Sequence, residues 1–417
     1  MAREAALRST AGRERAAAGE RDLLVIGLIT LGHFFAHFYI IALPPLFPVL
    51  ADALQVGYTE LGIALAVLNL VTTLTQAPIG VLVDRYGPAA ILIAGQTAFA
   101  IAIAGVGLFP HYGALLAFAA LAGLGNAVYH PADYAILNAR VSERRIGRAF
   151  SFHTFGGYAG FAAAPPVLVT LDALLGWRPA LVITGALGLL VALLMLIARR
   201  DLHVEPHPVS VARGTGWRHN LALLTSRPIL LSLLFITLYA TAHGGFNNFT
   251  VAFLERAYGF DLAAANAPLA AFLILGALGV LAGGIVADRV RAHDRVVAFC
   301  LLLVAAVAAL VAEWRLPFTL LVALFGLAGF AAGVVAPSRD MLVRSVTPPG
   351  AMGKVFGFVT TGFNIAGLVA PPLFGLVLDY GRPEHLLWLV ALLSLATLPA
   401  VIAASGAGTR SAAGERE

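Results

Sequence analysis

Polar and ionisable side chains recur at helical spacing inside long apolar segments of this chain. His33 and His37 are four residues apart and therefore share one face of a helix. Two further polar faces follow the same spacing. They comprise Asn126, His130 and Asp133, and then Tyr239, His243 and Asn247. Because histidine gains and loses a proton near neutral pH, such faces suit proton transfer or the binding of an anion.

These side chains do not form a recognisable catalytic or cofactor site. No Ser–His–Asp arrangement stands out, and no glycine-rich phosphate-binding loop is present, so we expect no cofactor and no use of ATP. The spacing of His33 and His37 suits zinc, but no carboxylate or Cys accompanies the pair, so we expect no metal site. The chain is not predicted to be an enzyme.

The segments that carry these residues have the composition of membrane spans. Of the 417 residues, 60% are hydrophobic and 12% are charged, and the mean hydropathy is +0.88. A helix needs about 20 apolar residues to cross a bilayer, and twelve segments meet that requirement. They run over residues 23–50, 58–82, 88–108, 112–138, 148–171, 178–199, 227–252, 266–288, 295–312, 317–339, 353–378 and 385–404. We therefore expect an all-α membrane protein with twelve transmembrane helices.

The distribution of Lys and Arg predicts the orientation of the spans. When the N-terminal tail and every second loop are assigned to one side, nearly all of the 27 basic residues fall there. The exceptions are Arg178, Arg256, Arg315 and Arg382. Basic loops face the cytoplasm, so both termini are expected there, in a bacterial inner (plasma) membrane. The net charge of +5 then reflects loops beside anionic lipid rather than a nucleic-acid partner.

The two halves of the chain repeat each other. Pro131 aligns with Pro337, the pair 165–166 aligns with the prolines at 371–372, and His37 aligns with His243. Parallel repeats of six helices are typical of transporters. The predicted parts are an N-terminal tail (1–22), a six-helix bundle (23–199), a cytoplasmic linker (200–226), a second six-helix bundle (227–404) and a C-terminal tail (405–417). We expect a monomer built from two pseudo-symmetric bundles.

Two short segments resemble a known signature. Gly80-Val-Leu-Val-Asp84-Arg85-Tyr-Gly87 resembles the loop between helices 2 and 3 of the major facilitator superfamily, and Gly284-Ile-Val-Ala-Asp288-Arg289 resembles its second copy. The resemblance implies a latch between the bundles, in which glycines permit close approach, an Asp caps a helix and an Arg meets a carboxylate. Further gate residues are expected at Asp133, Arg148, Arg339 and Asp340, with Asp133 paired to Arg85 or Arg148, and Arg339 and Asp340 paired to Asp288 or Arg289.

A narrower resemblance concerns helices 4 and 5. Gly123-Leu-Gly125-Asn-Ala-Val-Tyr-His130-Pro131 and Ser151-Phe-His-Thr-Phe-Gly156-Gly157 are similar to fosmidomycin-resistance-type efflux proteins. The resemblance implies a secondary transporter that works by rocker-switch alternating access, with proton-coupled efflux (antiport) of an anionic or drug-like small molecule. The resemblance to the superfamily also implies that helices 1, 4, 7 and 10 line the central cavity. The predicted substrate or proton sites are then His33, His37, Asn126, His130, Tyr239, His243 and Asn247.

Two other functions remain open at this point. The first is uptake of an organic anion by a symporter or uniporter. The second, of another class, is a non-transporting membrane sensor or scaffold. The polar faces described above do not separate these functions, because direction depends on the relative affinities of different conformations.

Overall fold

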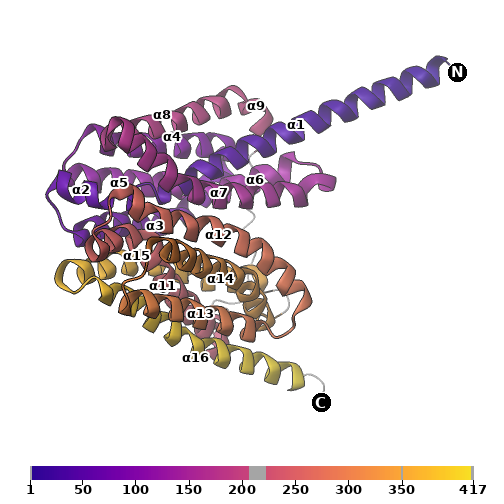
Figure 1. The fold of residues 1–417 in the computed structure, drawn as a ribbon. Coiled ribbons are helices and arrows are strands. Elements are labelled where there is room, and N and C mark those ends of the chain that lie inside the picture. The colour runs from indigo at the N-terminus through magenta and orange to yellow at the C-terminus, as the bar shows by residue number, and fades with distance from the viewer. Residues whose placement is uncertain (1, 206–221, 349–350, 415–417) are drawn as a thin grey trace.

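The computed structural model describes residues 2–205, 222–348 and 351–414, and every regular element in these ranges is a helix. Residues 206–221 of the predicted linker and residues 415–417 of the predicted C-terminal tail lie outside the described residues. Twelve helical stretches are long and apolar enough to cross a membrane, as predicted. They form two bundles of six helices, with both termini at the same end of the molecule (Figure 1). We call this end the termini side and the opposite end the distal side.

The first bundle contains the helices up to residue 197. Its elements are α1 (Ala2–Ile40), η1 (Pro44–Leu46), α2 (Phe47–Leu54), α3 (Tyr58–Tyr86), α4 (Pro88–Leu108), α5 (Tyr112–Asn126), α6 (Tyr129–Arg140), α7 (Glu143–Leu175) and α8 (Trp177–Ile197), followed by the short α9 (Arg199–Leu202). The first and fourth spans are each interrupted. Proline explains both breaks, because Pro44, Pro45 and Pro131 cannot donate a backbone hydrogen bond to the preceding turn.

The second bundle has unbroken spans. Its helices are α11 (Arg227–Tyr258), α12 (Leu262–Arg289), α13 (His293–Glu313), α14 (Phe318–Ser345), α15 (Met352–Tyr380) and α16 (Glu384–Gly414). Pro337 and the prolines at 371–372 lie inside α14 and α15 without ending them. The two halves of the repeat therefore share their order of spans and differ in local regularity.

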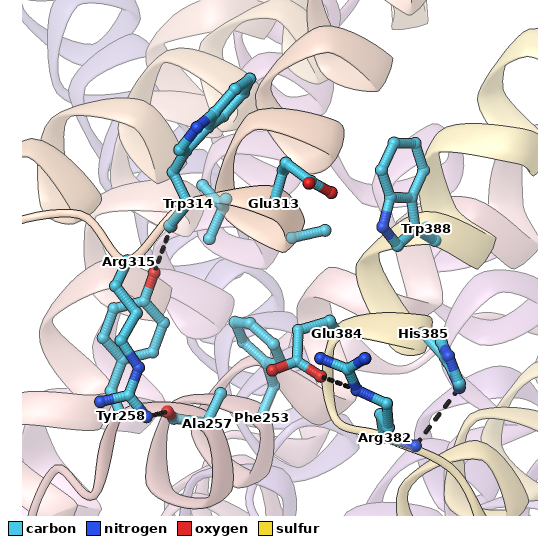
Figure 2. A pocket seen from close by; sticks show the side chains of 12 residues that line it. Phe253, Ala257, Tyr258, Glu313, Trp314, Arg315, Arg382, Glu384, His385 and Trp388 are labelled. Carbon is cyan, nitrogen blue, oxygen red and sulfur yellow. Dashed lines mark hydrogen bonds and ion pairs between the residues drawn. The ribbon is translucent and has the colours of Figure 1, made fainter.

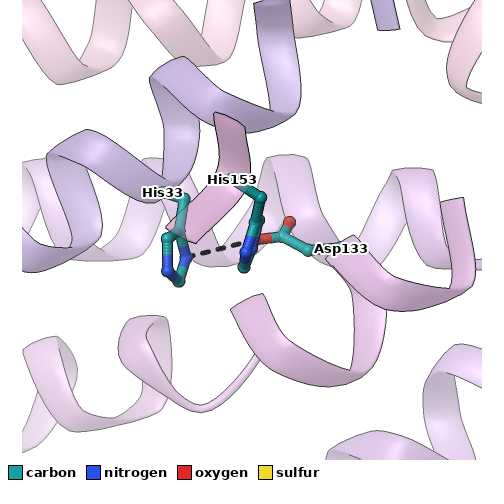
Figure 3. Close-up of side chains that lie close together, drawn as sticks. All are labelled: His33, Asp133 and His153. Carbon is teal, nitrogen blue, oxygen red and sulfur yellow. Dashed lines mark hydrogen bonds and ion pairs between the residues drawn. The ribbon is translucent and has the colours of Figure 1, made fainter. Parts of the chain in front are cut away.

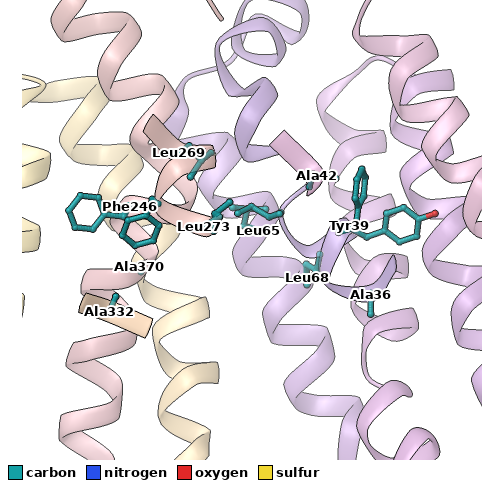
Figure 4. Close-up of a cluster of buried hydrophobic side chains, with 14 of the residues drawn as sticks. Ala36, Tyr39, Ala42, Leu65, Leu68, Phe246, Leu269, Leu273, Ala332 and Ala370 are labelled. Atoms are coloured by element: carbon teal, nitrogen blue, oxygen red, sulfur yellow. The ribbon is translucent and has the colours of Figure 1, made fainter. Parts of the chain in front are cut away.

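Two helix pairs form most of the interface between the bundles, α3 with α15 and α7 with α12, and α11 also packs against η1 and α2. Leu65 and Leu68 of α3 belong to the same buried cluster as Leu269 and Leu273 of α12 (Figure 4). Glycine permits the closest approach: a methyl group added at Gly62 of α3 would collide with the backbone of α15. Lipid is as apolar as these side chains, so close packing rather than burial from water holds such helices together.

Candidate functional site

A cavity of about 270 Å³ lies between the two bundles. Two helices contribute its polar lining: α3 supplies Asn69, and α11 supplies His243, Asn247 and Asn248. The apolar walls come from α1, α3, α7, α11 and α15. Because both bundles line the cavity, a rotation of one bundle against the other would change which end of it is open.

The polar groups of this cavity have unused hydrogen-bonding capacity. The side-chain oxygen of Asn247 is buried, and no partner for it occurs in the described part of the chain. The His243 ring lies between the rings of Tyr239 and Phe272, at centroid distances of 5.9 and 5.2 Å. Buried polar atoms normally have partners, so an orphaned oxygen in a cavity wall indicates a position that a ligand or water can satisfy.

A positive charge lies at the edge of the cavity. The guanidinium of Arg339 stacks 5.0 Å from the ring centre of Phe363, which lines the cavity. Arg339 forms an ion pair of 2.8 Å with Asp340, whose side chain is 52% exposed. Water screens an exposed carboxylate, so Arg339 keeps part of its attraction for a second anion.

Three of the seven predicted substrate or proton residues line the cavity, namely Tyr239, His243 and Asn247. Tyr239 donates its hydroxyl to the carbonyl of Ala332 at 2.9 Å, which ties α11 to α14. Asn69 and Asn248 complete the polar lining. Asn248 lies directly beside Asn247 in the sequence. Asn69 shares its helix with Thr73 and Gln76, a pattern typical of interhelical hydrogen bonds, so the sequence did not indicate its place in the cavity.

The other four predicted residues lie in the first bundle and are not among those that line this cavity: they are His33, His37, Asn126 and His130. Asn126 donates to the hydroxyl of Thr72 at 3.3 Å, which is an interhelical contact. The ring of His33 lies 4.5 Å from that of His37 and 5.5 Å from that of His130. His33 is buried and His130 is exposed.

The partners of the predicted gate residues differ from those expected. Asp133 contacts neither Arg85 nor Arg148 and instead lies 3.0 Å from Nε2 of His153 and 3.4 Å from Nδ1 of His33. The reason is geometric: Asp133 is buried inside the bundle, while both arginines are exposed. Arg339 pairs with its neighbour Asp340 rather than with the second signature copy.

The signature residues on the termini side make no latch in this conformation. Asp84 and Arg85 are exposed, as are Asp288 and Arg289. Among the described residues no ion pair or hydrogen bond joins these side chains to the other bundle. A methyl group added at Gly80 or at Gly284 would meet nothing within 4 Å, and Gly87 has a φ of +86°, as a tight turn requires.

The distal side is held by a different set of residues. Asp379, near the end of α15, accepts hydrogen bonds from the backbone of Tyr58 at 3.0 Å and of Thr59 at 2.7 Å, and from the Thr59 hydroxyl at 2.6 Å. Tyr58 also donates to Glu255 at 2.7 Å, and Arg256 lies over its ring at 4.6 Å. We call Tyr58, Thr59, Glu255, Arg256 and Asp379 the distal latch.

Local sequence explains why α3 needs a cap from the other bundle. The residue at its N-cap is Gly57, which has no side chain to bond the free amides of the first turn. A methyl group at Gly57 would lie 2.7 Å from the Asp379 carboxylate, so glycine also makes room for the cap. The matching helix α12 caps itself, because Asp261 accepts from the amide of Ala264.

A second pocket of about 250 Å³ opens on the distal side of the second bundle (Figure 2). Trp314 and Arg315 line it together with Arg382, Glu384 and His385. All of its lining residues come from the second bundle, so relative movement of the bundles would not open it to alternate sides. It is therefore a poorer candidate for a transport site than the central cavity.

Comparison with known proteins agrees with this architecture. The family model described as Major Facilitator Superfamily matches residues 29–313 and 238–411. The uncharacterized MFS-type transporter YfnC of Bacillus subtilis is 26% identical over 85% of this chain and 86% of its own. The probable sulfoacetate transporter SauU of Cupriavidus necator is 23% identical (85% and 87%), and the fosmidomycin resistance protein of Escherichia coli is 25% identical (89% and 90%).

A solved structure shows the same fold. An inward-facing, occupied bacterial homologue of the human lysosomal transporter Spinster superposes with a TM-score of 0.73 at 16% identity. The match covers 93% of this chain and 96% of the homologue.

Proposed function

This chain belongs to the Major Facilitator Superfamily and is a transporter of a small solute rather than an enzyme, and we propose that it works by rocker-switch alternating access. The observation that carries the proposal is the difference between the two ends of the molecule. The distal latch is formed, whereas the signature residues Asp84 and Arg85 have no partner across the bundles. One end is thus closed around the central cavity while the opposite latch is open.

With both termini in the cytoplasm of a bacterial inner membrane, as the basic loops favour, this conformation faces inward. Closure of the termini side would bring Asp84 and Asp288 against the other bundle and release Asp379. The two latches then stabilise opposite states, which is the bistability that alternating access needs. A monomer suffices, since both bundles that line the cavity belong to one chain.

We propose a small organic anion as the solute. Arg339 offers a positive charge at the edge of the cavity, His243 and the side-chain amides of Asn247 and Asn248 offer hydrogen bonds, and the rest of the wall is apolar. Such a cavity fits a carboxylate, sulfonate or phosphonate carried on a short organic body. The name of the relative SauU, a probable sulfoacetate transporter, supports this class.

Protons are the proposed coupling ion, and His243 is the imidazole that lines the cavity. The groups that face it are Tyr239, Phe272 and Arg339. A proton on His243 would increase the attraction for an anion, so proton and anion bind together and move in the same direction. This arrangement favours symport, the alternative left open by the sequence.

Proton-coupled efflux is the second candidate, because the relative named fosmidomycin resistance protein covers nearly the whole chain. Antiport requires proton and solute to compete for one site. In the central cavity this is achieved by a solute that binds only neutral His243, such as a drug-like cation or an uncharged compound. The two candidates therefore predict opposite directions of proton flow for one added solute.

The test is proton flow in proteoliposomes, reported by a pH-sensitive dye inside the vesicles, while sulfoacetate, other carboxylates, phosphonates and cationic drugs are added outside. Symport acidifies the lumen when an anion enters, whereas antiport makes it alkaline. His243→Gln should abolish the coupled flow, and His385→Gln, in the second pocket, should leave it intact. Solute uptake without any proton flow would overturn the coupling and leave a uniporter.

A further inference from the structure

A second polar cluster lies inside the first bundle, outside the central cavity. It consists of His33 from α1, Asp133 from α6 and His153 from α7, which are only 4%, 1% and 2% exposed. Figure 3 shows the three side chains converging from three helices. Ionisable groups at such depth are costly unless they have partners, so their convergence calls for an explanation.

The hydrogen bonds within the cluster do not satisfy it. Nε2 of His153 lies 3.0 Å from Oδ2 of Asp133, which fits one hydrogen bond. Nδ1 of His33 lies 3.4 Å from the same oxygen, but without the geometry of a hydrogen bond. Among the described residues, that nitrogen and the second carboxylate oxygen, Oδ1 of Asp133, both lack a partner. A proton shared between Asp133 and one imidazole leaves the other imidazole unsatisfied.

The distances match the edges of a metal coordination sphere. Donor atoms bound to zinc at about 2.0–2.1 Å in tetrahedral geometry lie about 3.3 Å from one another. The two contacts to the Asp133 oxygen, 3.0 and 3.4 Å, lie on either side of that value. One donor atom from each of the three residues falls within 4.8 Å of the others.

From this geometry we propose that His33, Asp133 and His153 form a binding site for a divalent transition-metal ion of the zinc class. Two imidazole nitrogens and one carboxylate oxygen are zinc ligands, whereas Mg²⁺ and Ca²⁺ prefer oxygen alone. Three protein ligands leave a fourth position for water.

The metal would hold the first bundle together. Its three ligands come from α1, α6 and α7. The break between α5 and α6 separates α6 from the first part of its span, and the ion would tie α6 to its two neighbours. No ligand comes from the second bundle. Metal binding is therefore independent of the latches and of the solute, and it stands or falls separately from the proposed function.

The test measures zinc binding directly. The full chain, purified in nanodiscs with an affinity tag that lacks histidine, is stripped with a chelator and titrated with Zn²⁺ by calorimetry. The wild type should bind about one Zn²⁺ per chain, and Co²⁺ should give the strong visible absorption of a four-coordinate site. Asp133→Asn and His153→Ala should each weaken zinc binding by at least about tenfold.

Two variants keep the result interpretable. Asp133→Glu retains a carboxylate and should retain binding, whereas His243→Gln removes a histidine of the second bundle and should leave zinc affinity unchanged. Gel filtration and circular dichroism verify that each variant is folded. A stripped wild type that takes up no Zn²⁺ overturns the proposal, and so does binding that is equal in the wild type and the folded Asp133→Asn and His153→Ala variants.

Discussion

Replacing Asp379 with Asn should shift the protein away from the conformation described here. The carboxylate accepts two backbone hydrogen bonds at the start of α3 and a third from the Thr59 hydroxyl. Asn keeps the size of the side chain and one oxygen, but it loses the charge and one acceptor. The amides of the first turn of α3 are then left partly unbonded, and the distal side opens more readily.

The size of the shift follows from these contacts. A hydrogen bond to a charged group contributes about 1.5–3 kcal/mol, and one such acceptor is lost. The ion pair with Arg256, at 3.7 Å, adds little because the Arg256 side chain is 38% exposed. A change of about 1.5–3 kcal/mol corresponds to about a 10-fold to 150-fold change in the ratio of the two states.

Distances between spin labels report this ratio. Cys300 is the sole cysteine, so a Cys300→Ala background accepts labels at Ala53 and Glu313 on the distal side and, in a second sample, at Arg144 and Arg291 on the termini side. All four label sites are exposed. In Asp379→Asn the distal distance should lengthen and the termini-side distance should shorten, as measured by double electron–electron resonance.

The matched control is Asp172→Asn. Asp172 holds a similar place near the end of α7, the pseudo-symmetric counterpart of α15, yet in the described chain it makes no bond to α12, which is capped by Asp261. Its replacement should leave both distances unchanged. If the two variants gave the same distance distributions, a cap supplied by Asp379 could not be what closes the distal side.

Three further outcomes follow from the same structure. Gly57→Ala should shift the label distances in the same direction as Asp379→Asn, because the added methyl group would lie 2.7 Å from the Asp379 carboxylate. Unchanged distances would show that the carboxylate can move aside at no cost. Asp84→Asn should shift the label distances in the opposite direction and favour the present conformation, since Asp84 has no partner across the bundles here and gains one only when the termini side closes. A shift toward the outward-facing state would contradict the proposed latch. Asn247→Leu should raise the KM for the transported anion about tenfold, because removal of a buried hydrogen-bonding group costs about 1–3 kcal/mol. Solute uptake assays in proteoliposomes measure this KM. An unaltered KM would show that Asn247 does not bind the solute.

The fold could be predicted because its determinants are local and repeated. Twelve apolar segments, a proline pattern shared by the two halves and one loop signature were sufficient for the architecture. Helix ends were less accurate: α7 begins at Glu143, ahead of the predicted 148, because charged residues extend the helix beyond its apolar part. Side-chain composition marks the part of a helix that lies in lipid, not the point at which its hydrogen bonds end.

The contacts that define the site were harder to predict, for a physical reason. Asp379 bonds to backbone amides of residues more than 300 positions away, and an amide carries no mark in the sequence. His153 lies near the start of a span, and the sequence does not link it to its partners Asp133 and His33, because these come from other helices. Helical spacing reveals which residues share a face, but the pairing of faces depends on how the helices pack.

The aligned halves differ at positions that hold ionisable side chains. By the offset that aligns Pro131 with Pro337, Asp133 corresponds to Arg339 and His153 corresponds to Val359. The second bundle thus has a fixed cation where the first has a metal-binding carboxylate, and it lacks the matching imidazole. The first bundle's ionisable groups are turned inward against each other, whereas the second bundle presents His243 and Asn247 to the cavity. In the proposed mechanism, the second bundle therefore recognises the solute, while the first bundle, held by its own cluster, is the rigid body against which the second moves.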